Sequence, residues 1–105
     1  MTGIDIVYTV FPDSESASTV ARACIHDGLA ACANILPPCT SIFEWEGDIA
    51  ENSETPVIFK TTAARVDALM ERIGIMHPYE VPAILSWPVV RTPHAFSKWV
   101  DSVTH

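Results

Sequence analysis

The sequence predicts an α+β fold with the element order β-α-β-β-α-β and one further helix at the C-terminal end. Runs rich in β-branched and aromatic residues, which are typical of strands, alternate with stretches whose apolar residues have the 3.6-residue spacing of a helix. Clusters of Gly, Pro, Asn and Asp separate these runs. The length of 105 residues is that of one domain, so residues 1–105 are expected to fold as a single unit.

The first third of the chain alternates strand, helix and strand. Residues 4–11 carry one charge among β-branched and aromatic residues, which predicts a largely buried strand. Pro12-Asp13-Ser14 supplies a helix N-cap, and the apolar spacing that follows predicts an amphipathic helix ending near Gly28. Cys24 lies on its apolar stripe and is expected to be a small buried hydrophobe. Residues 29–36 predict the next strand.

A long hairpin is predicted in the middle of the chain. Pro37-Pro38 favours a kink or bulge at a sheet edge. Residues 40–46 then read as a strand, Gly47-Asp48 as a turn, Asn52-Ser53 as further loop, and residues 55–61 as an antiparallel returning strand. Such a hairpin is longer than the core of a small domain needs, so its partly aromatic edge is expected to be covered.

The last third predicts helix, strand and helix. Thr62 is expected to cap a second helix that Gly74 and Pro78 bring to an end. Residues 83–90 read as a strand, and Thr92-Pro93 as the start of a short final helix. The whole order is that of the split βαβ, or ferredoxin-like, fold, an antiparallel sheet with two helices on one face. The other face is expected to be covered by another subunit.

Charge and composition exclude several classes of partner. A net charge of −7 and a pI near 4.8 argue against nucleic acid and anionic membranes, and are compatible with cations as ligands. The N-terminus has no signal-peptide pattern, and no apolar run approaches the length of a membrane span, so we expect a soluble, cytoplasmic protein. Three cysteines without a secretory context, and without a C-x-x-C pair, predict free thiols.

The segment His77-Pro78-Tyr79-Glu80-Val81-Pro82 is the strongest candidate for a site, since two prolines stiffen a loop that carries an imidazole, a phenol and a carboxylate. A well-shaped turn with solvated side chains is the alternative. Thiolate, imidazole and carboxylate from Cys32, His77 and Glu80 would suit copper or zinc if folding brought them together. The common nucleotide-binding and hydrolase motifs are absent, so an enzyme is not expected, although a Cys/His nucleophile pair stays open.

The combination of motifs closely resembles the CutA divalent-cation tolerance family over essentially the whole chain. The resemblance rests on Leu29 to Ile35 (LAACANI), Ser41 to Gly47 (SIFEWEG), Lys60-Thr61 and the His77 to Pro82 loop. The resemblance implies a ferredoxin-like subunit in a homotrimer built partly by the long hairpin, a cytoplasmic location, and a role in tolerance of copper and other divalent cations.

The resemblance also implies roles for individual residues. Cys32, His77 and Glu80 match positions proposed as metal ligands, and Tyr79, Trp45 and Lys60 match positions around an inter-subunit cleft. Ala83 departs from the pattern, because many members carry a Glu there. Cys24 and Cys39 do not belong to the pattern.

The hypothesis from sequence is therefore a non-enzymatic homotrimer that binds copper or other divalent metal ions. The alternative is a trimeric small-molecule sensor similar to PII-type signal proteins, with Lys60, Trp45 and Tyr79 lining a cleft for a nucleotide or another anionic ligand. A scaffolding trimer is a third interpretation. Purely structural roles are also open: core packing for Cys32, interface packing for Trp45 and ion pairing for Lys60.

Overall fold

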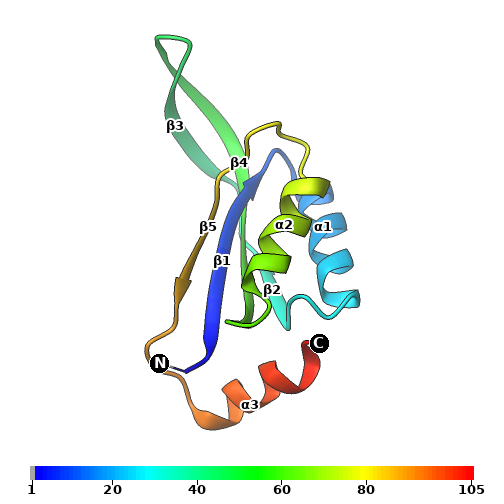
Figure 1. The fold of residues 1–105 in the computed structure, drawn as a ribbon. Coiled ribbons are helices and arrows are strands. Elements are labelled where there is room, and N and C mark those ends of the chain that lie inside the picture. The colour runs from blue at the N-terminus through cyan, green and yellow to red at the C-terminus, as the bar shows by residue number, and fades with distance from the viewer. Residues whose placement is uncertain (1) are drawn as a thin grey trace.

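The computed structural model describes residues 2–105 and confirms the α+β prediction (Figure 1). The sheet has the order β2-β4-β1-β5 with antiparallel pairing throughout, and β3 extends it by pairing with β4. Helices α1 and α2 cover one face of this ferredoxin-like sheet, and α3 lies across the end opposite the hairpin. The elements are β1 (Ile4–Phe11), α1 (Ser14–His26), β2 (Cys32–Ile35), β3 (Cys39–Trp45), β4 (Asp48–Thr62), α2 (Val66–Met76), β5 (Ile84–Pro88) and α3 (His94–Val103).

The hairpin of β3 and β4 is confirmed, but its turn and its second strand differ from the prediction. Trp45 pairs with Asp48, so the turn consists of Glu46 and Gly47, whose φ angles are 51° and 85°. Positive φ at both positions is the type I′ geometry whose twist matches that of the flanking strands. This turn sets a continuous ladder, and the ladder overrides the weak strand preference of Asn52-Ser53, which pair within β4 instead of forming a loop.

A bulge at Pro37-Pro38 divides one long edge strand into β2 and β3. Ile35 pairs with Val57 and Cys39 pairs with Glu54, so four steps along one strand oppose three steps along β4. This confirms the predicted interruption. Residues 29–31, predicted as strand, instead form a buried connection, because the chain first has to leave α1 through Gly28 at φ 72°.

Both later helices begin differently from the prediction. Thr62 is the last residue of β4, where it pairs with Ile4, and the N-cap of α2 is Arg65. Gly74 does not end α2, which continues to Met76, since a single helical glycine costs less than the packing of the helix provides. The N-cap of α3 is Pro93 rather than Thr92, and its extended ψ of 141° sets the helix start at His94.

The core lies between the sheet and the two helices. β1 contributes Val7 and Phe11, and the stripes of α1 and α2 pack on them. Cys24 is fully buried in this layer, as its position on the apolar stripe predicted. A second small cluster, in which Val100 packs with Ile4 and Ala31, fixes α3 at the end of the sheet.

The opposite face of the sheet exposes large apolar side chains. Because paired residues of antiparallel strands share a face, Leu85 and Trp87 of β5 lie beside Tyr8 and Ile6 of β1. Leu85 is 51% exposed and Trp87 is 44% exposed. We call this surface the open sheet face. Among residues 2–105, no helix is long and apolar enough to span a membrane.

Candidate functional site

The loop from His77 to Pro82 is anchored at its start by the imidazole of His77. The ring stacks on Phe11 with 4.4 Å between centroids. Its Nε2 donates to the carbonyl of Val10 at 2.8 Å, and its Nδ1 accepts the N–H of Tyr79 at 3.1 Å. This pattern assigns the proton to Nε2 and leaves both ring nitrogens engaged. Burial lowers the pKa of His77, although the Val10 hydrogen bond and the charge of Glu54 oppose that shift.

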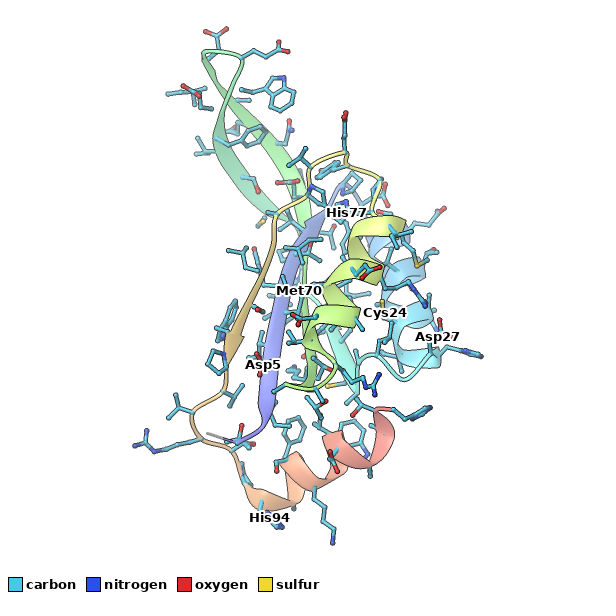
Figure 2. All side chains as sticks on the ribbon, in the orientation of Figure 1. Asp5, Cys24, Asp27, Met70, His77 and His94 are labelled. Atoms are coloured by element: carbon cyan, nitrogen blue, oxygen red, sulfur yellow. The ribbon has the colours of Figure 1, made fainter. Side chains whose placement is uncertain are left out.

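Tyr79 provides a second anchor, which ties the loop to β4 rather than to β1. Its hydroxyl donates to Oε2 of Glu54 at 2.7 Å, and Glu54 is only 8% exposed although it carries a carboxyl group. Burial, together with the hydrogen bond and charge of Glu54, raises the pKa of Tyr79 to about 12. The phenol therefore keeps its proton at neutral pH and acts as the donor. Figure 2 shows His77 at the end of the sheet from which the hairpin departs.

Glu80 follows these anchors and is exposed, as is Val81. Pro78 and Pro82 restrict the residues that precede them. The loop thus holds an accessible carboxylate on a backbone that is tied at His77 and Tyr79 to the core and to β4. A fixed carboxylate of this kind is suited to binding a cation.

Cys32 and Lys60 lie toward the other end of the sheet. They pair across β2 and β4, and the Nζ of Lys60 donates to Oδ1 of Asn34. Lys60 also pairs with Ile6, whereas His77 contacts Val10, four residues further along β1. That separation along the strand is roughly 13 Å. Metal–ligand bonds are about 2.0–2.6 Å long, so Cys32 and His77 of one chain lie too far apart to share an ion.

Within the part of the chain that the structure describes, residues 2–105, no group of three or more His, Cys, Asp and Glu side chains lies close enough to hold a metal ion. The set of His77, Glu80 and Cys32 is therefore not gathered in one chain. Folding of one chain does not bring the three side chains together, and their role as metal ligands stays a prediction. Cys39, which pairs with Glu54, is a free, half-buried thiol like Cys32.

The three predicted cleft residues are also dispersed. Trp45 is 64% exposed beside the hairpin turn, and Lys60 lies twelve residues along β4 from the partner of Trp45. This is roughly 40 Å of strand. Tyr79 lies between them, where β4 enters the sheet. These side chains could line one cleft only if different chains supplied them.

Sequence reasoning missed Glu54 and Phe11, which hold the loop, and Asn34, which binds Lys60. The position of Glu54 was hidden because residues 52–53 were interpreted as loop. Centring the hairpin on Glu46 and Gly47 would have placed Glu54 in a strand, opposite Cys39. The contact between His77 and Phe11 has no comparable sequence signal.

Comparisons with known proteins agree with this fold. The family model of the CutA1 divalent ion tolerance protein matches residues 5–103. The divalent-cation tolerance protein CutA of Thermus thermophilus is 36% identical over 95% of this chain and 97% of its own length. Protein CutA of Mus musculus is 38% identical over 96% of this chain, which spans only 57% of the mouse protein. The crystal structure of CutA1 from Ehrlichia chaffeensis superposes with a TM-score of 0.95 at 34% identity, covering 100% of this chain and 98% of that one.

Proposed function

The chain belongs to the CutA1 divalent ion tolerance family, and we propose that it binds copper or another divalent metal ion as a cytoplasmic homotrimer. The proposed role is binding in the response to metal ions, without catalysis. Family membership does not place a protein in a compartment, so the cytoplasmic location is part of the proposal.

The observation that supports the proposal is that two of the predicted donors, Glu80 and Cys32, are available to an ion. Glu80 is exposed on an anchored loop, and Cys32 is a free, half-buried thiol on the edge strand β2. They lie on different parts of the sheet, so we propose that they would share an ion between copies of the chain rather than within one. Thiolate with carboxylate suits a borderline or soft ion such as zinc or copper.

The exposed apolar surface supports the assembly of copies. The open sheet face presents Leu85 and Trp87, and the hairpin presents Ile42, Trp45 and Ile49. Exposed apolar side chains that gather on one surface are typical of interaction sites. The edge strand β2 and the protruding hairpin are both available to contact a second copy. Identical chains usually assemble with closed symmetry.

His77 enters the proposed site differently from the other two ligands. A metal ion needs the lone pair of an unprotonated ring nitrogen, and at Nδ1 that lone pair accepts the N–H of Tyr79. Ligation by His77 requires the loop to give up this bond. We therefore propose Glu80 and Cys32 as the first contacts, with His77 recruited only after the loop rearranges.

Calorimetric titration of reduced, metal-free protein with Cu(II) and with Zn(II) tests the proposal, with the mass in solution measured alongside. We expect saturable binding at a fixed ratio per trimer, weakened at least tenfold by Glu80→Gln and by Cys32→Ser. The matched control is Cys39→Ser, which removes another free, half-buried thiol and is expected to leave the affinity unchanged. Wild-type dissociation constants above about 1 mM, equivalent to about −4 kcal/mol, would rule out direct binding in the cell.

The alternative function, a PII-like sensor of an anionic ligand or nucleotide, is favoured by one observation. Lys60 is half-buried, and its amine donates to the neutral amide of Asn34 rather than to a carboxylate. Its charge is thus left for an anion. Thermal-shift measurements with nucleoside triphosphates test this function. Stabilisation that Lys60→Met abolishes would favour the sensor, and no shift with any nucleotide counts against it.

A further inference from the structure

Glu54 is a buried carboxylate whose hydrogen-bond partner lies on the loop that carries Glu80. It belongs to β4 at the point where the hairpin leaves the sheet, and it is only 8% exposed. It accepts the hydroxyl hydrogen of Tyr79 at 2.7 Å. A buried carboxylate needs hydrogen bonds to compensate for the water it has lost, so this contact strongly favours one position of Tyr79.

The other contacts of the loop hold a different part of it. His77 is held by the Phe11 ring and the Val10 carbonyl, both at the end of β1. The N–H of Tyr79 then bonds back to His77, which fixes the backbone locally. The bond between the Tyr79 side chain and Glu54 is the hydrogen bond that ties the loop to β4 and thus to the hairpin. It fixes the loop at the residue immediately before Glu80.

We propose that Glu54 is a positioning residue for metal binding: acting through the Tyr79 hydroxyl, it holds the Glu80 loop in fixed register with the base of the hairpin. This inference rests on the proposed function, since it takes Glu80 as a ligand. A site shared between copies needs each copy to present its donor at a set position. A loop that is already ordered loses less conformational entropy when the ion binds.

Partners that orient a metal ligand typically change the affinity by tenfold or more when they are removed. Tyr79→Phe, which deletes only the hydroxyl, is therefore expected to weaken Cu(II) binding about tenfold. Glu54→Gln is expected to bind Cu(II) nearly as wild type does, because the amide oxygen still accepts from Tyr79. In the double variant, Glu54→Gln should add nothing to the loss caused by Tyr79→Phe.

The experiment is Cu(II) calorimetry on these three variants, with urea unfolding of each to confirm that it is folded. Ser102→Ala is the control. It removes another side-chain hydroxyl, which donates to the carbonyl of Trp99 in α3, away from the loop and from the open sheet face, and wild-type affinity is expected. Wild-type affinity in Glu54→Gln would distinguish positioning from direct ligation, because an amide is a much poorer metal ligand than a carboxylate.

Three results would overturn the inference. If Glu54→Gln lost binding while Tyr79→Phe kept it, Glu54 would be a ligand itself. If Tyr79→Phe were less stable but bound Cu(II) normally, the contact would serve the fold alone. In both cases the proposed function survives as long as Glu80→Gln weakens binding. If the wild-type protein bound no metal, both the function and the positioning role would be rejected.

Discussion

Thr9 and Thr61 should respond in opposite directions to the same substitution. Both side chains are fully buried at 0% exposure. In the described part of the chain, residues 2–105, Oγ1 of Thr9 has no hydrogen-bond partner. Thr9 shares the helix-covered face of β1 with Val7 and Phe11, so its hydroxyl lies among apolar groups. Thr61 instead donates to the carbonyl of Leu29 at 2.7 Å.

The magnitudes follow from the cost of an unmade hydrogen bond. A buried polar group without a partner costs about 1–3 kcal/mol. Thr9→Val removes that cost and keeps the branched shape, so the free energy of unfolding should rise by about 1 kcal/mol. Thr61→Val removes a bond and leaves the Leu29 carbonyl without this donor, so the free energy should fall by about 2 kcal/mol. The two variants should therefore differ by about 3 kcal/mol.

Urea unfolding at one fixed protein concentration measures both variants, because the apparent stability of an assembling chain depends on its concentration. The slope of the free energy of unfolding against urea concentration should be the same in each variant, so that the midpoints report stability alone. If Thr9→Val were less stable than wild type with an unchanged urea dependence, the hydroxyl of Thr9 must be satisfied in the folded protein. The Thr9 hydroxyl would then not be the destabilising buried group that its burial predicts.

Three further outcomes are expected. Burial lowers the pKa of His77, so as the pH falls below about 6.5 the unfolded chain takes up a proton before the folded one does. Stability should therefore decrease from pH 7 toward lower pH, and the decrease should be shallower in His77→Gln when urea midpoints are compared. Gly28 has φ 72°, so Gly28→Ala should lower stability by about 1 kcal/mol. The cost should persist in a His105→Ala background, because the nearby His105 ring can move aside; a cost that disappears there would implicate the ring contact at 2.9 Å. Burial raises the pKa of Cys24 to about 11. In the double variant Cys32→Ser, Cys39→Ser, the remaining thiol should therefore react with a disulfide reagent only after unfolding in urea. Reaction in native buffer would contradict its burial.

The sequence predicted the elements better than it predicted their ends. Strong periodicity identified all three helices, and the run of β-branched residues gave β1 at its observed bounds, Ile4–Phe11. The bulge at Pro37-Pro38 was also predictable, since proline has no N–H for the ladder. Asn52-Ser53 was not, because the register from the turn at Glu46 and Gly47 outweighs what those residues prefer locally.

The candidate site was predicted only as a set of residue types. Sequence identified the loop, its prolines and its donors. It could not identify the partners of His77 and Tyr79, which lie 67 and 25 residues away along the chain. Nor could it give the distance from Cys32 to His77, which depends on where each lies along the sheet. Hydrogen-bond partners and ligand distances depend on strand order and register, and no local pattern encodes them.

By itself, the sequence determined the acidic charge and predicted free thiols. Its spacing of apolar residues determined which face of each helix and strand is apolar, and its prolines indicated a stiff loop bearing His77, Tyr79 and Glu80. Only the tertiary structure decided that His77 has both ring nitrogens engaged, that Glu54 holds Tyr79, and that the proposed donors do not meet within one chain. The physical reason is the range of the forces involved. Periodicity and proline act within a few residues, whereas these contacts form once the packing of helices on the sheet fixes which distant groups become neighbours.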